Sequence, residues 1–186
     1  MTAPTSNYPD IRQDVIQLLT KTSEPDRMKH HILPVVNNAL RLAERLNADA
    51  EVVELAAYFH DFTRITGDKA NHHNSSADIA REFLEKYHYP EAKIRLVEDC
   101  IRHHRGSLDS PRNSVEEKIV CTADAMAHLQ KPLPFFHKWY GRFQMSIDDG
   151  ARETREKMER TWNKIQFDFV KEEMKDLYNY LMEILK

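Results

Sequence analysis

A histidine and an aspartate stand side by side at the end of an apolar helical run. The run VVELAAYF, residues 52–59, leads directly into His60 and Asp61. Burying a carboxylate without a partner is strongly unfavourable, so a core helix that ends this way must compensate the charge. An arginine, a helix cap or a metal ion could each do so.

The ten histidines include three adjacent pairs, at residues 30–31, 72–73 and 103–104. Neighbouring residues on a helix point about 100° apart, whereas residues three or four apart share a face. Only one member of a helical pair can therefore face the core, and the apolar pattern around each pair indicates which one.

Two of these pairs can be assigned from the pattern. His31 lies at the edge of the apolar stripe of its predicted helix, so His30 is expected to face solvent. In the later helix, apolar steps of three and four lead through Ile101 to His104, which leaves His103 on the solvent side. The pair at 72–73 precedes a predicted helix, and periodicity does not choose between its members.

A second carboxylate is directed to the interior. Asp124 is the only formally charged residue between Lys118 and Lys131, and it lies one turn before His128. A single inward histidine is more often a hydrogen-bonded core residue than a ligand, and a single inward aspartate often joins two helices. Several imidazoles and two carboxylates together are satisfied at once by a divalent metal. Such ligands suit manganese, iron, nickel, cobalt or zinc.

The order of a histidine, an adjacent His-Asp pair about one helix later and a distant aspartate resembles the HD-domain superfamily of metal-dependent phosphohydrolases. The surrounding segments HILPV, AAYFHD and CTADAMAHL carry the likeness, which spans roughly residues 26–130. The resemblance implies that His31, His60, Asp61 and Asp124 bind a divalent metal. The residues do not choose among manganese, cobalt, nickel, magnesium and iron.

Many members of that superfamily place further histidines between the doublet and the last aspartate. His72 stands four residues before Ser76, where a small-residue helix start is expected, and His104 ends the next helix. Both fit that arrangement, and the spacing favours His72 over His73. If both bind, they form a second metal site or contact the substrate.

The implied activity is hydrolysis of a small phosphorylated compound, a nucleotide or a related ester, by a phosphatase or phosphodiesterase. A metal lowers the pKa of a bound water and polarises a phosphoryl oxygen, and Asp61 could accept a proton from that water. Cationic side chains should neutralise the phosphoryl oxygens. Arg64, one turn after His60, is the first candidate, followed by Lys69, Arg105 and Lys118. The alternative for each cation is an ordinary surface charge.

Two features leave the chemistry open. Phe62-Thr63 replaces the small or glycine-containing continuation that is common after the doublet, and no acid follows Asp61 closely to match the general acid of some nucleotidase members. The alternative function is a non-hydrolytic metal-binding protein of the same fold, either a sensor module or a di-iron oxygenase.

The elements that must position these residues are all helical, because only four glycines occur and no long stretch alternates apolar and polar residues. We expect one all-α domain over residues 1–186, a compact HD-type bundle with a motif-bearing core at about 26–130 and additional C-terminal helices at 134–186 packed on it. Asn74 can cap one helix, and Ser114 with Glu117 forms a capping box. The predicted helices are 9–20, 26–47, 49–63, 74–88, 90–104, 114–130, 134–146 and 149–185.

The composition indicates which classes of partner and which cellular compartment to expect. The 186 residues are 41% hydrophobic and 31% charged, with a formal charge of −3 and no basic stretch for a nucleic acid. No segment approaches the roughly 20 apolar residues of a membrane span, and the N-terminus lacks an apolar signal region. Cys100 and Cys121 are isolated and predicted to be reduced core residues. A cytoplasmic protein is expected.

The last third of the chain allows two interpretations. Trp139 and Tyr140 lie in the aromatic segment FFHKWYGRF and could form a wall for a nucleobase, although packing against the core is the simpler explanation. A partly exposed apolar stripe in the final helix could support a homodimer.

Overall fold

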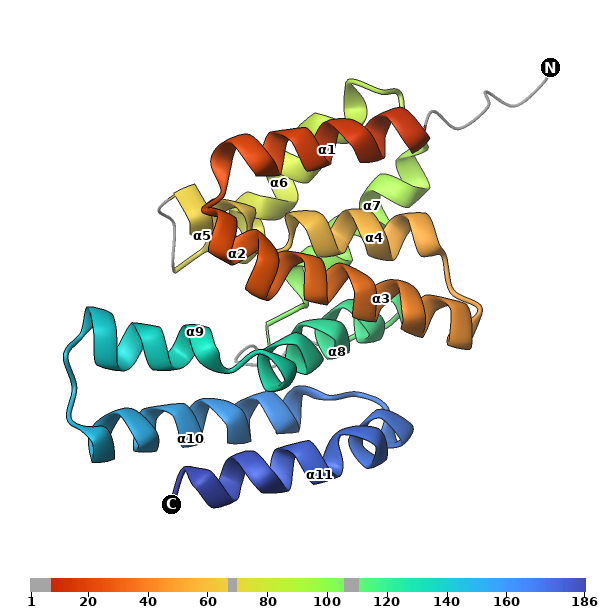
Figure 1. Ribbon diagram of the computed structural model, residues 1–186. Helices are drawn as coiled ribbons and strands as arrows, with labels where there is room; N and C mark the ends of the chain where they lie inside the picture. The colour runs from red at the N-terminus through yellow and green to blue at the C-terminus, as the bar shows by residue number, and fades with distance from the viewer. Residues whose placement is uncertain (1–7, 67–69, 106–110) are drawn as a thin grey trace.

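The computed structural model describes residues 8–66, 70–105 and 111–186, and every regular element in these ranges is helical (Figure 1). The all-α prediction is therefore confirmed. Among the described residues, no helix is both long enough and apolar enough to cross a membrane. The helices are α1 (Tyr8–Thr22), α2 (Pro25–Arg27), α3 (Leu33–Leu46), α4 (Ala50–Phe59), α5 (Phe62–Thr66), α6 (His72–Glu85), α7 (Glu91–Arg102), α8 (Val115–Gln130), α9 (Leu133–Phe136), α10 (Ile147–Lys164) and α11 (Asp168–Ile184), with π-helical turns η1 (Met28–Ile32) and η2 (His137–Arg142).

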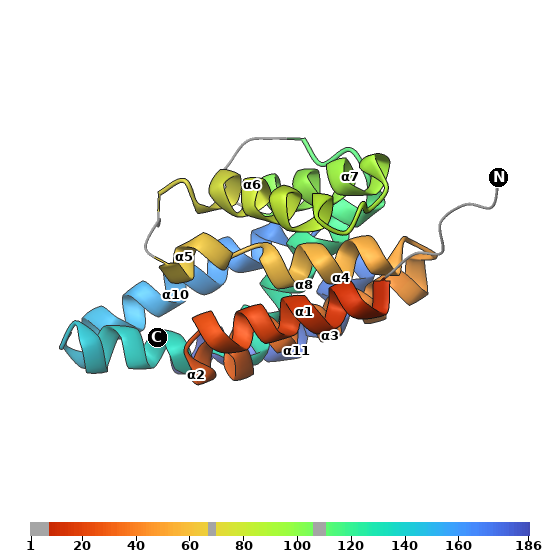
Figure 2. The ribbon, with the colours of Figure 1, turned by 90° about the horizontal axis from the view of Figure 1, so that it is seen from above.

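The core is built around α8 and α4. Every residue of α8 at positions 119–127 is buried, and so is every residue of α4 at positions 52–59. Figure 2 shows α6 and α7 on one side of α4 and α1 on the other. The helices α3, α7 and α10 all pack against α8. A polar side chain at positions 119–127 of α8 or at the end of α4 therefore lies deep in the protein.

Local sequence signals predict some helix ends correctly and others wrongly. The predicted capping box at the start of α8 is confirmed, with the Ser114 hydroxyl accepting from the Glu117 amide at 3.1 Å. The predicted Asn74 cap is wrong, because α6 begins at His72 and Asn71 precedes it. Asn74 instead donates its side-chain amide to Asn71 Oδ1 at 2.8 Å. The histidines at 72–73 consequently occupy the first turn of α6.

The predicted single helix over 149–185 is wrong, because the chain turns between α10 and α11. Ile165 is extended, with φ −65° and ψ 125°, and its side chain is buried. The backbone N–H of Gln166 donates to the Thr122 hydroxyl of α8 at 3.1 Å. This bond replaces the one that the same N–H would make within a continuous helix. This break lets α11 fold back beside α10, as Figure 1 shows.

The segment α9–η2 runs beside the first half of α10 in both views (Figures 1 and 2). Gly150 of α10 lies so close to Tyr140 of η2 that a Cβ there would overlap the tyrosine ring. The Tyr140 hydroxyl donates to the Ile147 carbonyl at 3.0 Å. Tyr140 thus holds η2 against α10, and this packing occupies the ring that could have formed a nucleobase wall.

Candidate metal centre

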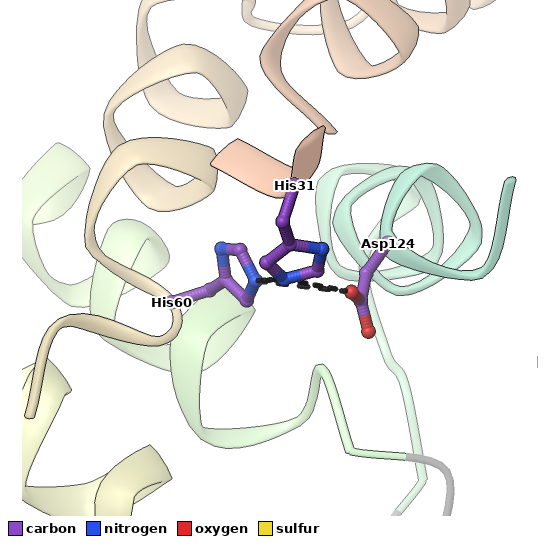
Figure 3. A group of neighbouring side chains, drawn as sticks. All are labelled: His31, His60 and Asp124. Atoms are coloured by element: carbon purple, nitrogen blue, oxygen red, sulfur yellow. Dashed lines mark hydrogen bonds and ion pairs between the residues drawn. The ribbon is translucent and has the colours of Figure 1, made fainter. Parts of the chain in front are cut away.

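Three side chains from three separate elements point toward one another: His31 from η1, His60 from the turn after α4, and Asp124 from α8 (Figure 3). His31 Nε2 lies 3.1 Å from His60 Nε2 and 3.5 Å from Asp124 Oδ1. His60 Nε2 lies 3.8 Å from the same aspartate oxygen. All three residues are buried. We call them the first cluster.

A second cluster, formed by Asp61, His72 and His104, lies beside the first. Asp61 Oδ1 is 3.2 Å from His72 Nε2 and 3.8 Å from His104 Nε2. The other oxygen, Asp61 Oδ2, is 3.4 Å from His31 Nε2 and 3.9 Å from His60 Nε2. The Asp61 carboxylate therefore stands between the two clusters and presents one oxygen to each.

The backbone holds two of the imidazoles in the form that binds metals. His60 Nδ1 lies 2.8 Å from the Ala57 carbonyl, and His104 Nδ1 lies 2.6 Å from the Ile101 carbonyl, so each Nδ1–H donates there. Burial lowers the pKa of His60 to about 4 and the pKa of His104 well below its ordinary value. Both rings are neutral at neutral pH, and each directs an Nε2 lone pair at the centre.

This donor set fits a divalent cation. Two metal–nitrogen bonds of about 2.1 Å at a right angle place their nitrogens about 3.0 Å apart, close to the 3.1 Å between the two Nε2 atoms of the first cluster. Asp61 Oδ1 and Asp124 Oδ1 are buried and accept no hydrogen bond from any described residue. A buried carboxylate oxygen without a donor is costly, and a cation at each cluster would satisfy the oxygen that faces it.

Cations also approach the two aspartates from outside the clusters. Arg27 Nη2 lies 2.6 Å from Asp61 Oδ2, and Arg64 Nη1 lies 3.7 Å from the same oxygen. Lys164 of α10 forms an ion pair with Asp124 Oδ2. Burial alone would raise the pKa of each carboxyl, but the neighbouring histidines and Arg64 hold the pKa of Asp61 well below the usual value, and Lys164 and the neighbouring histidines do the same for Asp124. Both are ionised at neutral pH.

Sequence reasoning did not select Arg27, His128 or Lys164. His128 Nε2 lies 3.3 Å from Asp124 Oδ1, and its ring stacks on His31 with centroids 4.7 Å apart. Helical spacing could have indicated Arg27, four residues before His31, and His128, four residues after Asp124. No local pattern indicates Lys164, which lies 40 residues beyond Asp124.

The clusters open into a cavity of about 560 Å³. Asp61, Asp124, His72, His104 and His128 form part of its wall, and Phe135 and Trp139 add aromatic surface. The wall also holds six cationic side chains: Arg64, Arg105, Lys138, Lys157, Arg160 and Lys164.

The remaining predicted residues are dispersed. Arg64 and Arg105 line the cavity, and Arg105 donates to the Ala70 carbonyl at 2.8 Å. Lys118 is half-buried on α8 and is not among the residues that line this cavity. Lys69 lies outside the described residues. His103 faces away from the clusters and pairs with Glu117 Oε2 at 2.5 Å.

The family model of the HD domain matches residues 28–129, more than half of the chain. The chain belongs to the HD domain family.

A symmetrical bis(5'-nucleosyl)-tetraphosphatase of Bacillus subtilis (strain 168) is 30% identical over 113 residues, which cover 50% of this chain and 58% of that protein. The chain thus spans little more than half of that relative's length. The crystal structure of a predicted HD superfamily hydrolase from an uncultured Thermotogales bacterium is similar, with a TM-score of 0.52, 25% identity and coverage of 66% of this chain and 67% of that chain.

The HD-domain match contains both clusters but ends before a large part of the cavity wall. His31, His60, Asp61 and Asp124 all lie within residues 28–129. Lys138, Lys157, Arg160, Lys164, Phe135 and Trp139 lie beyond it, on α9, η2 and α10. The helices added after the HD domain therefore supply much of the surface that a substrate would contact.

The two neighbouring histidines after α7 provide a prediction with an internal control. His104 is buried against Asp61, whereas His103 is half-exposed and belongs to the start of α8 through Glu117. Replacing His104 by alanine should reduce turnover or the amount of bound metal, because the second cluster would lose one of its three potential ligands. His103→Ala should leave both near the wild-type values. Steady-state rates and metal analysis of the two variants check this, and equal losses in both would contradict it.

Proposed function

We propose that this protein is a metal-dependent phosphohydrolase that cleaves a phosphate ester of a small molecule, a nucleotide or a related compound. The observation that carries the proposal is the common cavity, whose wall combines Asp61, His72, His104 and Asp124 of the two clusters with six cationic side chains. Three acids, Asp61, Asp124 and Glu153, line the same cavity. With both cluster aspartates occupied by a cation, the remaining charge of the wall is positive and suits a phosphate.

The side chains divide into those that would hold the metal and those that would hold the substrate. His31, His60, Asp61 and Asp124 would bind one divalent ion, and His72 and His104 with Asp61 would bind a second ion or the substrate. Such an ion lowers the pKa of a water molecule and polarises a phosphoryl oxygen. Asp61 would accept a proton from that water, a role that the reach of its carboxylate to both clusters supports. Arg64 and Arg105 line the cavity and can donate hydrogen bonds to phosphoryl oxygens.

The nucleotide class is supported by the relative from Bacillus subtilis, whose name describes a nucleosyl tetraphosphatase. That protein is 30% identical and only partly covered, so the substrate of this chain requires its own test. A screen of nucleotides and other phosphate esters with added manganese, cobalt, nickel, magnesium or iron would identify the substrate. Release of phosphate from at least one of them is the expected result, and no release with any metal would contradict the proposal.

One observation favours the alternative of a di-iron oxygenase or sensor. The Asp61 carboxylate directs one oxygen to each cluster, an arrangement that would suit two adjacent ions. Metal analysis of protein purified without chelators distinguishes the two functions. One equivalent of manganese, cobalt or nickel supports hydrolysis, whereas two equivalents of iron with visible absorption and no phosphate release support oxidation or sensing.

Arg64 is expected to bind the phosphoryl group that is cleaved. Its side chain is half-exposed, lines the cavity and lies 3.7 Å from Asp61 Oδ2. A guanidinium offers paired hydrogen bonds that a lysine cannot copy. Arg64→Lys should therefore lower kcat/KM by about ten- to a hundredfold, the worth of a charged hydrogen bond. Steady-state kinetics measure this effect.

Metal content serves as the control for Arg64, because arginine does not ligate a cation. It should stay unchanged in both Arg64→Lys and Arg64→Ala. Wild-type kcat/KM in both variants would leave Arg64 as an ordinary surface charge. Sequence spacing offers Asp68 as its partner in that case, and Asp68 lies outside the described residues.

A further inference from the structure

Two polar side-chain atoms in the cavity wall are buried without a hydrogen-bond partner. Trp139 Nε1 and Thr161 Oγ1 make no hydrogen bond with any part of the chain that the structure describes. Thr161 is only 2% exposed, and both residues line the cavity. Leaving a buried donor unsatisfied costs more than a typical hydrogen bond contributes. A ligand group in the cavity would supply the missing partner.

An unpaired ammonium lies on the same face. Lys157 precedes Thr161 by one helical turn on α10, so their side chains are neighbours. Within the described ranges, no carboxylate oxygen comes within 4 Å of Lys157 Nζ, whereas the nearby Lys164 is paired with Asp124. Lys157 Nζ instead lies 5.6 Å from the centre of the Phe135 ring. Burial lowers the pKa of Lys157 to about 8, so the group remains mostly charged at neutral pH.

The donors at this site select for an anion. An indole N–H and an ammonium can only donate, and a hydroxyl can donate or accept. The matching group therefore carries several acceptor oxygens and a negative charge, which describes a phosphate better than a nucleobase edge. The Trp139 ring is itself in contact with other side chains, because Lys138 Nζ lies 3.7 Å from its centroid and the Phe143 ring lies 5.6 Å away. Its N–H, rather than its face, is the group in need of a partner.

We propose that Trp139, Lys157 and Thr161 form a second anion site, which binds a phosphate group of the substrate other than the one that is cleaved. This inference rests on the proposed function and extends it. Substrates with two or more phosphate groups should then bind better than monophosphates. All three residues lie beyond the HD-domain match, so the selectivity comes from the added helices.

Calorimetry on the metal-loaded protein tests the second anion site with two probes. Methylenediphosphonate carries two phosphoryl groups and resists hydrolysis, and orthophosphate carries one. Lys157→Met should weaken methylenediphosphonate binding by about tenfold or more and leave orthophosphate binding unchanged. Thr161→Val keeps the side-chain shape and removes only the hydroxyl, whereas Trp139→Phe keeps an aromatic ring but removes the indole N–H together with part of the ring. Each should weaken methylenediphosphonate binding by about fivefold. Lys175→Met, which removes an exposed lysine of α11, is the matched control and should change neither affinity.

The outcomes separate this inference from the proposed function. Equal weakening of both probes, or unchanged methylenediphosphonate affinity in all three variants, would overturn the second anion site even in an active hydrolase. Selective weakening of methylenediphosphonate in a protein that hydrolyses no phosphate ester would support the site and contradict the proposed activity. If Lys157→Met fails to fold, the isosteric Thr161→Val variant still tests the second anion site.

Discussion

Protein in which alanine replaces His60 is expected to lose its bound metal and its hydrolytic activity together. His60 is completely buried, its Nδ1–H is fixed on the Ala57 carbonyl, and its Nε2 lies 3.1 Å from His31 Nε2. Alanine removes one of the two imidazole nitrogens of the first cluster. Loss of a direct ligand should exceed the ten- to hundredfold loss of metal affinity typical of mutations around a metal site. Metal analysis after purification and the rate on the best substrate measure both effects.

His30→Ala is the matched control for this experiment. His30 lies next to His31 in the π-helical turn but is only half-buried and belongs to neither cluster. The control variant should keep its metal and its rate. Full metal retention in His60→Ala would contradict the assignment of the first cluster, and loss of metal in both variants would point to general misfolding instead.

Asp61→Asn is expected to have the second large effect, because this carboxylate faces both clusters. The amide keeps the shape of the side chain but loses the negative charge that balances the bound ion. The amide would also present its NH₂ group toward either the His31 side or the His72 side of the clusters. We expect metal binding to weaken at both clusters and the rate to fall by about 10²- to 10³-fold, the scale of losing a fixed charge in an active site.

A matched control for Asp61→Asn is Asp78→Asn. Asp78 is an exposed aspartate of α6 that pairs with Arg102 at 2.6 Å and belongs to neither cluster. Its variant should retain metal and activity. Thermal unfolding of metal-free Asp61→Asn adds a separate readout: the variant loses the charge that Arg27 contacts at 2.6 Å, so its unfolding temperature should fall relative to metal-free wild type. Unchanged metal content in Asp61→Asn would contradict the role of Asp61 between the clusters.

The local pattern determined the helical architecture and the inward direction of several polar side chains. Apolar steps of three and four predicted that His104 rather than His103 turns inward, and the structure buries His104 while His103 remains half-exposed. The Ser114 capping box likewise depends on residues three positions apart. Both features follow from contacts within one helix, which the order of residues encodes directly.

The positions of the helix breaks could not be predicted from the local sequence pattern. The apolar spacing continues through residues 165–167, yet the chain leaves the helix there because a hydroxyl on α8 accepts the Gln166 amide. The predicted start of α6 is also wrong, since Asn71 and Asn74 are both plausible caps by residue type. In each case the competing conformations differ by contacts that lie outside the local window.

Only the tertiary structure determined which charges meet at the clusters and what closes the cavity over them. The pairs Arg27–Asp61 and Lys164–Asp124 join residues 34 and 40 positions apart, and the added helices bring Trp139, Lys157 and Thr161 to the same wall. Residue types and spacing predict which side chains each helix can bury. The crossing of α10 over α8 decides which of these side chains come within a few ångströms of one another. Since ion pairing and metal binding depend on those separations, this part of the site follows from helix packing and not from any single stretch of sequence.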